Sequence, residues 1–178
     1  DRFQSVWLTR YLSDSPESAY IRVGRNAVPD IYSEEDTFEP GRARVLKSGE
    51  DIAIIATGQT VYHALKAAEK LEADGIRPTV IDIFTIKPLD ESSVIAAAEN
   101  TRCILTVEEH SIYGGLGAAV AEITSQHHPT PMKILGIPDE NAVHGNPPEI
   151  FSHYGLDAEG ITRHATALLP LLEGPLKY

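Results

Sequence analysis

Residues 51–75, DIAIIATGQTVYHALKAAEKLEADG, set the fold class, because their apolar pattern changes at a single glycine, Gly58. Residues 52–56 are apolar at every position, which is typical of a parallel strand covered on both faces. Residues 61–73 then predict a helix, and Gly75 is suited to end it. The apolar face of that helix is Val61, Leu65, Ala68 and Leu71. The stretch therefore predicts one strand-turn-helix unit of an α/β fold.

The same alternation of strand and helix continues to the end of the chain. Strands are predicted over 41–49, 77–85, 102–109 and 131–138. Helices are predicted over 91–99, with Asp90 as the N-cap, and over 115–126, 147–154 and 157–172. Strands that alternate with helices form a parallel, doubly wound sheet. The predicted fold class is therefore α/β, with three layers and a mostly parallel sheet.

The first forty residues differ in composition from the rest. Residues 2–12 place apolar side chains at helical spacing, and the alternation in AYIRVGR, residues 19–25, predicts a strand. Residues 26–41 carry two prolines, one glycine and five acids. This composition predicts a linker, with a domain boundary near residues 35–40.

Charge and composition exclude several classes of protein. The 178 residues carry a formal net charge of −11 without a cluster of Lys and Arg, so nucleic acid and anionic membranes are poor partners. No apolar run approaches the roughly 18 residues of a membrane-spanning helix. The single cysteine, Cys103, excludes an internal disulfide and a cysteine-based zinc site. No signal peptide is recognised, so a cytoplasmic protein is expected, and the start at Asp1 indicates a piece of a longer protein.

The stretch VEEHSIYGGLGAAVAE, residues 107–122, raises the question of a phosphate-binding loop. Gly115 and Gly117 match the first two glycines of a dinucleotide fingerprint, but Val120 stands at the third position. Two glutamates at the end of the preceding strand would repel a pyrophosphate, and no P-loop lysine follows. We therefore expect these glycines to let a helix start close to the sheet.

Four side chains are candidates for a functional site. His110 stands beside two glutamates at the carboxyl end of a strand, where open α/β sheets place their ligands. His144 lies in a polar loop after the last strand and could face the same edge. Arg22 and Arg25 lie on and just after the N-terminal strand, and an arginine fork suits phosphate or carboxylate. A structural role for His110, and pairing of the arginines with nearby acids, are the alternatives.

An ordered series of motifs resembles the C-terminal third of transketolase-like proteins and covers almost the whole chain. The segments are YIRVGRNAVP, DIAIIATGQTVYHALKAAEKL, IDIFTIKPLD, TVEEHSIYGGLGAAVAE and KILGIPDENAVHGNPPEIFSHYGLDAEGI. The resemblance implies a protein of three domains. Residues 1–36 would be the tail end of the pyrimidine-binding domain with a linker, and residues 37–178 the C-terminal domain.

The resemblance also implies an activity, which is transfer of a two-carbon ketol unit between sugar phosphates. The family's first two domains bind thiamine diphosphate with Mg²⁺ (or Ca²⁺), and its catalytic and metal-binding residues lie upstream of residue 1. This chain alone is therefore expected to have no catalytic residue and no metal ligand, to bind no cofactor and to be inactive. Its partners would be the upstream domains, on the same polypeptide or on a separate N-terminal subunit, in a homodimer or heterotetramer.

The family's arginine for the substrate phosphate corresponds to Arg25 in VGRNAVP, and Arg22 is a second candidate. The loop with Glu108, Glu109 and His110 resembles a corner near the subunit interface, and His144 joins it as a candidate at the site edge. Two other thiamine enzymes have the same domain: 1-deoxyxylulose-5-phosphate synthase and the β subunit of 2-oxo acid dehydrogenases. A noncatalytic dimerisation or regulatory module, and a nucleotide binder, are the remaining alternatives.

Overall fold

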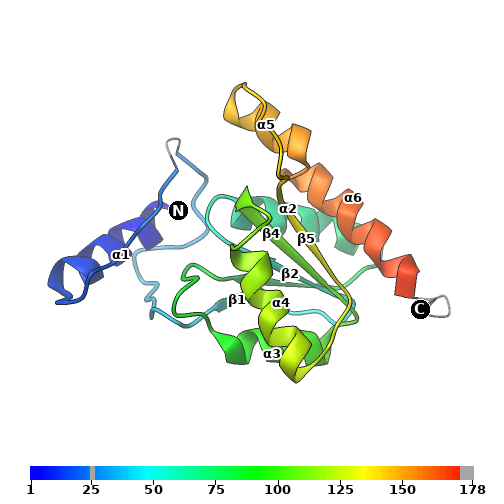
Figure 1. The fold of residues 1–178 in the computed structure, drawn as a ribbon, viewed down its shortest axis with the longest axis horizontal. Helices are drawn as coiled ribbons and strands as arrows, with labels where there is room; N and C mark the ends of the chain where they lie inside the picture. Colours follow the sequence, from blue (N-terminus) through cyan, green and yellow to red (C-terminus); the bar gives the residue numbers. More distant parts are fainter. Residues whose placement is uncertain (25–26, 173–178) are drawn as a thin grey trace.

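The computed structural model describes residues 1–24 and 27–172, the last two by their backbone alone. A five-stranded sheet is covered by helices on both faces (Figure 1). The strands are β1 (Arg44–Lys47), β2 (Ile52–Ala56), β3 (Pro78–Asp82), β4 (Ile104–Ser111) and β5 (Met132–Ile137). The helices are α1 (Arg2–Asp14), α2 (Thr60–Ala73), α3 (Glu91–Asn100), α4 (Leu116–His127), α5 (Pro147–Tyr154) and α6 (Ala158–Leu168), which a 3₁₀ turn, Leu169–Leu172, follows.

The strand order is β1-β3-β2-β4-β5. β1 is antiparallel to β3, and the other neighbours are parallel, so the sheet is mostly parallel and doubly wound as predicted. The chain leaves β2 toward β3 on one side and later returns to β4 on the other side of β2. The direction in which strands are added therefore reverses between β2 and β4.

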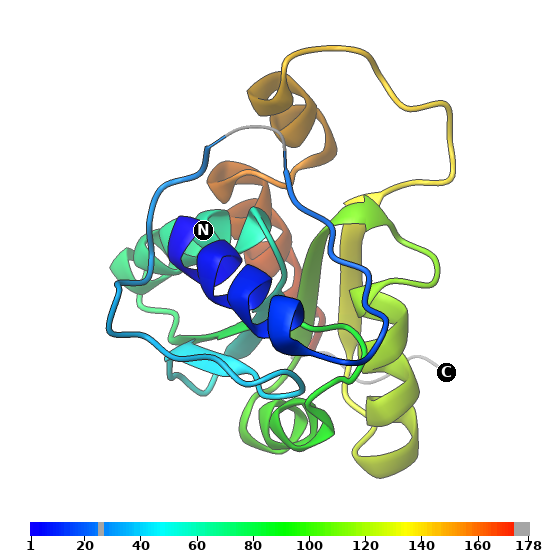
Figure 2. The same cartoon turned by 90° about the vertical axis from the view of Figure 1, so that its left-hand side faces the viewer.

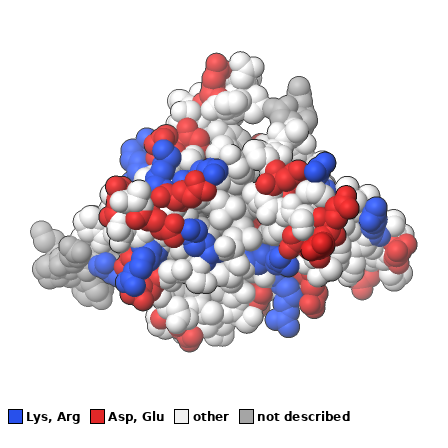
Figure 3. Space-filling model, turned by 180° about the vertical axis from the view of Figure 1, so that it is seen from behind, with Lys and Arg blue, Asp and Glu red and all other residues white. Residues whose placement is uncertain are grey.

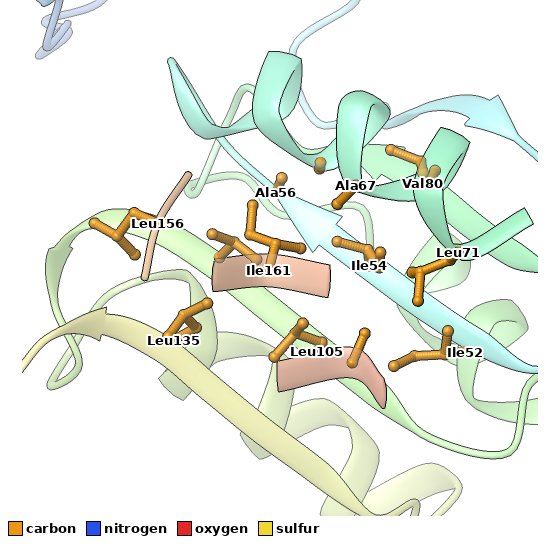
Figure 4. Packing of buried hydrophobic residues seen from close by; sticks show 14 of the residues in the cluster. Ile52, Ile54, Ala56, Ala67, Leu71, Val80, Leu105, Leu135, Leu156 and Ile161 are labelled. Carbon is orange, nitrogen blue, oxygen red and sulfur yellow. The ribbon is translucent and has the colours of Figure 1, made fainter. Parts of the chain in front are cut away.

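β2 separates two apolar cores, which explains why all five of its residues are apolar. Ile52, Ile54 and Ala56 face α2 and α6, whereas Ala53 and Ile55 face α3 and α4. Figure 4 shows the first of these cores, where Ile54 and Leu105 of the sheet point toward Ile161 of α6. Because successive side chains of a strand point to opposite faces, a strand buried on both faces has no position that faces water, which favours apolar residues along its length.

Local signals place most helix ends where they were predicted. The Asp90 carboxylate accepts from the Ser93 N–H over 3.1 Å and caps α3, and Gly155 ends α5 in the left-handed conformation, with φ 70°. The last helix is shorter than predicted: α6 stops at Leu168 and a 3₁₀ turn replaces its end. Pro170 explains the difference, because it has no N–H to continue the α-helical hydrogen bonds.

The N-terminal segment, of which residues 1–24 and 27–38 are described, lies outside the sheet and its covering helices (Figure 2). Its helix α1 is formed as predicted but has no buried residue. The strand predicted over 19–25 is wrong for residues 19–24, which have no regular secondary structure. Alternation alone does not make a strand, because a strand is held by hydrogen bonds to a neighbouring strand. In the described part of the chain, no strand pairs with residues 19–24.

Aromatic rings join this segment to the sheet. The Phe38 ring lies edge-on to three others, at centroid distances of 5.7 Å to Trp7, 4.8 Å to Tyr32 and 5.6 Å to Phe84. Phe84 follows β3, whereas Trp7 belongs to α1. Edge-to-face rings at such distances attract one another beyond their burial alone. The cluster therefore anchors the segment beside the carboxyl end of β3.

Charged side chains of both signs are interspersed on the surface that Figure 3 shows. Several lysines are paired with acids, among them Lys47 with Glu72 and Lys70 with Glu159, each pair at 2.6 Å. In each pair the glutamate neutralises the lysine charge, so these lysines do not contribute to a positively charged patch. Among the described residues, no helix is long and apolar enough to cross a membrane.

Candidate functional site

The carboxyl ends of β2 and β4 meet where the strand order reverses. In open α/β sheets this switch point is the usual place for a ligand-binding crevice. Residues 57–59 follow β2 there, and residues 108–110 lie near the end of β4. This edge of the sheet is therefore the first place to look for a functional site.

Glu108 fills the N-terminus of α4. It is 2% exposed, and its two oxygens accept hydrogen bonds from the N–H groups of Leu116 and Gly117, both at 2.8 Å. A carboxylate is favoured there because a helix begins with unpaired N–H groups and the positive end of its dipole. A Cβ at Gly115 would stand 2.0 Å from a Glu108 oxygen, and one at Gly117 2.4 Å from Ile134. The glycines thus let the helix start against the sheet, as predicted, and the protein's own carboxylate takes the place of a phosphate.

Gln59 and Glu109 join the carboxyl ends of β2 and β4. The Gln59 side-chain N–H donates to Glu109 Oε2 over 3.0 Å. Arg22 approaches the other oxygen of the same carboxylate, with 3.8 Å between Nη2 and Oε1. Gly24 lies so close to Gln59 that a Cβ there would stand 2.0 Å from Gln59 Nε2. The N-terminal segment therefore approaches the switch point through Arg22 and Gly24.

Arg25, the predicted phosphate-binding residue, lies outside the described residues, so its role stays a prediction. The role of Arg22 toward a phosphate also stays a prediction, because its observed neighbour is Glu109. Residues 27–29, just after Arg25, line a pocket of about 190 Å³. The other lining residues are Gln59, Tyr62 and His63 of α2 and its N-terminus, and Pro147, Pro148 and Phe151 of α5. His63 is partly buried where it lines this pocket, and its burial lowers the pKa of the imidazole.

His110 lies near the carboxyl end of β4, and His144 lies in the loop after the neighbouring parallel strand β5, so both are placed at the same edge of the sheet. His110 is exposed, and its Nδ1 lies 3.1 Å from the carbonyl oxygen of Ser111 and 4.0 Å from Glu108 Oε2. His144 is exposed in the loop after β5, where it lines a second pocket with Glu149 and His153. A role for these histidines, or for Glu108 and Glu109, at a subunit interface stays a prediction.

Asp82 is a buried carboxyl group that sequence reasoning missed. It ends β3, and its Oδ2 accepts hydrogen bonds from Gln4 Nε2 at 2.8 Å and from the Tyr32 hydroxyl at 2.7 Å. Its Oδ1 has no hydrogen-bond partner among the described residues. Burial raises the pKa of Asp82, and it raises that of Tyr32 too. A signal was present: an acid in a strand predicted to be buried must find partners, and here they come from the N-terminal segment.

The described residues do not fit a metal ion or a diphosphate group. They contain no cluster of three or more His, Cys, Asp or Glu side chains that could hold a metal. The glycine-marked N-terminus of α4, where a diphosphate could be held, is filled by Glu108. No chemical step through a cofactor is therefore assigned to the described side chains.

Known proteins show strong similarity to this chain. The family described as "Transketolase, C-terminal domain" matches residues 41–161. A subunit of the apulose-4-phosphate transketolase of Phocaeicola vulgatus is 52% identical over 166 residues, which are 93% of this chain and 53% of that relative. A 1-deoxy-D-xylulose-5-phosphate synthase of Chlorobium luteolum is 40% identical over 128 residues, which are 71% of this chain and 20% of the synthase.

A solved structure described as a split gene transketolase, an inactive beta4 tetramer, has the same fold. It superposes with a TM-score of 0.91 at 37% identity, and the match covers 96% of this chain and 56% of that one. The chain therefore spans about half the length of the split transketolase subunits that it matches. With its sheet order, its helix layers and these matches in agreement, the chain belongs to the transketolase family, as a C-terminal portion that carries the family's C-terminal domain.

Proposed function

We propose that the complete protein is a thiamine-diphosphate-dependent transketolase that moves a two-carbon ketol unit between sugar phosphates. The observation that carries this proposal is the 52% identity to an apulose-4-phosphate transketolase subunit over 93% of the chain. That match is longer than the range of residues 41–161 that the family model covers. It therefore includes sequence before or after the domain that the family model describes.

In this proposal residues 1–36 are the tail end of the pyrimidine-binding domain with a linker, and residues 37–178 are the C-terminal domain. The difference in burial supports the division, because α1 has no buried residue whereas both apolar cores are built from the residues after it. Arg25 binds the phosphate of the sugar substrate, and Arg22 is the second candidate. Supporting this, Arg22 approaches Glu109, Gly24 lies close to Gln59 before α2, and residues 27–29 line the pocket beside α2, at the carboxyl edge of the sheet.

Thiamine diphosphate and Mg²⁺ (or Ca²⁺) would be held by parts of the enzyme outside this chain, and the thiamine ring supplies the carbanion chemistry. The partners would be the pyrophosphate and pyrimidine domains, in a homodimer or heterotetramer. Two relatives, one named as a transketolase subunit and the other as a split gene transketolase, favour a separate N-terminal subunit over a single polypeptide. A cytoplasmic location is part of the same proposal.

A ketol-transfer assay tests the proposal. Xylulose 5-phosphate is the donor, ribose 5-phosphate the acceptor, and thiamine diphosphate and Mg²⁺ are present throughout. The assay is run on this chain alone, and on the full-length subunit mixed with its N-terminal partner. We expect turnover only in the mixture. An assembled, cofactor-loaded mixture that transfers no ketol unit would reject the assignment.

A 1-deoxyxylulose-5-phosphate synthase is the second candidate, because a synthase of that name is 40% identical over 71% of the chain. The same mixture is therefore also supplied with pyruvate and an aldehyde phosphate. A transketolase leaves pyruvate unused, whereas a synthase consumes it and releases carbon dioxide. Pyruvate consumption without ketol transfer would favour the synthase.

A further inference from the structure

Arg163 and His164 of α6 direct two nitrogen atoms to the same place beside Gly155. A Cβ at Gly155 would stand 3.2 Å from Arg163 Nη2 and 3.1 Å from His164 Nε2. Gly155 ends α5 with φ 70°, a conformation that favours glycine, and a glycine also keeps any side chain out of the space beside these nitrogens. Two nitrogen atoms from neighbouring residues therefore face one small region of the surface.

Lys133 of the edge strand β5 fixes which nitrogen of His164 carries the proton. Lys133 Nζ lies 2.9 Å from His164 Nδ1. An ammonium group can only donate, so Nδ1 is the acceptor and the proton of the neutral ring is on Nε2. Burial lowers the pKa of His164, and the charges of Lys133 and Arg163 lower it further, which favours the neutral ring. His164 Nε2–H is therefore a hydrogen-bond donor on the side of Arg163.

The acids that stand nearest to Arg163 in the sequence are engaged elsewhere. Glu159 precedes Arg163 by four residues, the usual spacing of a helical ion pair, but it pairs with Lys70 at 2.6 Å. The Asp157 carboxylate accepts from the Gly160 N–H over 2.8 Å and caps α6. Among the described residues, Arg163 therefore has no acidic partner.

Three basic side chains thus lie together without an acid, in a chain whose formal net charge is −11. We propose that Arg163 and His164 bind a phosphate group, as inorganic phosphate or a small phosphate monoester, and that Lys133 is a positioning residue that keeps the His164 proton on Nε2. An arginine fork and an N–H donor suit phosphate oxygens, and a phosphate carries about 1.5 to 2 negative charges at pH 7 to offset the clustered positive charge. None of these side chains enters the proposed ketol transfer, so the inference stands apart from it.

Phenylglyoxal, which modifies arginine side chains, tests the site in the full-length subunit assembled with its partner. Mass spectrometry follows the labelling of Arg163 as inorganic phosphate is added. Two charge-assisted hydrogen bonds predict half-protection at about 1 mM phosphate and about tenfold slower labelling at about 10 mM. Arg10 is the control within the same molecule, because it is exposed and has no acidic partner among the described residues. We expect its labelling rate to stay unchanged.

Variants separate the two roles in the site. His164→Ala removes one donor and should raise the half-protecting phosphate concentration about tenfold. Lys133→Met removes the donor to Nδ1 and should raise it about fivefold, whereas Lys133→Arg keeps a donor and should restore protection. Lys87→Met is the matched control, because Lys87 is an exposed lysine in the loop before α3, and should change nothing.

Each remaining outcome would overturn the inference. Equal protection of Arg10, or equal protection by sodium chloride at the same ionic strength, would mean that phosphate only screens charge. Acetate that protects as well as phosphate would reject the phosphate class, and an unchanged half-protecting concentration in His164→Ala would reject the donor pair. An Arg163 that is not labelled in the assembled enzyme is covered by another part of it, and no site is then open. An enzyme without ketol transfer would reject the proposed function separately and leave the Arg163 readout intact.

Discussion

The N-terminal segment and the sheet domain are held by different kinds of contact. The sheet domain, from β1 to α6, surrounds two apolar cores, whereas α1 has no buried residue and residues 15–24 have no regular structure. The segment contacts the domain through the ring pair of Phe38 and Phe84, through the hydrogen bonds to Asp82, and through the approach of Arg22 to Glu109. Stability should therefore reside in the sheet domain, and the predicted substrate contacts in the segment that it positions.

The largest expected effect is a loss of stability in the core. Ile54 of β2 is fully buried, and Ile54→Ala leaves a cavity between the sheet and its covering helices, so it should lower the free energy of unfolding by about 2–5 kcal/mol. The matched change in the segment, Val6→Ala, removes methyl groups that are 48% exposed and should cost less than about 0.5 kcal/mol. Urea unfolding followed by circular dichroism measures both. Similar losses in the two variants would contradict the division between domain and segment.

The second effect is functional and belongs to the segment. Arg25→Ala in the complete enzyme should raise KM for phosphorylated acceptors by about 10- to 100-fold, since a hydrogen bond to a charged group contributes about 1.5–3 kcal/mol. KM for unphosphorylated acceptors and the unfolding midpoint should stay unchanged. Arg25→Lys is the matched control, because it keeps the charge but loses the bidentate fork, and should fall between the two. Equal effects on both kinds of acceptor would remove Arg25 from the phosphate site.

The third effect concerns the carboxylate at the start of α4. In Glu108→Gln, one amide oxygen can accept only one of the two N–H bonds, and the amide NH₂ meets the other N–H group. Leaving that buried donor unpaired should cost about 1–3 kcal/mol of stability. Glu122→Gln is the control, because Glu122 is exposed on the same helix. Thermal unfolding measures both variants. Equally small losses of stability in Glu108→Gln and Glu122→Gln would mean that the two hydrogen bonds of Glu108 do not stabilise the start of α4.

Features that depend on residues close together in the sequence could be predicted. β2, α2 and the N-cap Asp90 are of this kind, because they follow from the local apolar pattern and from local hydrogen bonds, and these predictions are confirmed. The strand over 19–25 was predicted from alternation, which carries no information on whether a partner strand is present. Residues 19–24 have the alternating pattern of a strand but are not in one, because no described strand pairs with them.

The candidate site was harder to predict, because its contacts join residues far apart in the chain. The sequence placed Glu108, Glu109 and His110 at the carboxyl end of a strand, and the structure has them there. It gave no sign that Glu108 turns inward to the helix while Glu109 turns to Gln59, fifty positions away. Neither Gln59 nor Asp82 was singled out, since an amide after a turn and one acid in a strand are common until their partners are known.

The smallest expected effect concerns the pH dependence of the contact between Asp82 and the segment. Burial raises the pKa of Asp82 above the value of about 3.9 that an unfolded chain would have. The folded state therefore binds a proton more tightly than the unfolded state. The stability that this proton contributes is fully present below the unfolded pKa, and it is lost as pH rises through the raised, folded pKa.

Asp82→Asn tests this linkage, because it resembles the protonated acid. The amide oxygen can still accept from Gln4 and Tyr32, and the NH₂ takes the place of Oδ1, which has no partner among the described residues. Urea unfolding of wild type and variant is compared from about pH 7 down to about pH 4. We expect the wild type to gain stability relative to Asp82→Asn as pH falls, and Asp139→Asn, an exposed control, to show no such gain. A difference that stays constant or shrinks toward low pH would mean that Asp82 is held as a carboxylate, and that the segment is docked by charge and not by a neutral hydrogen-bonded cluster.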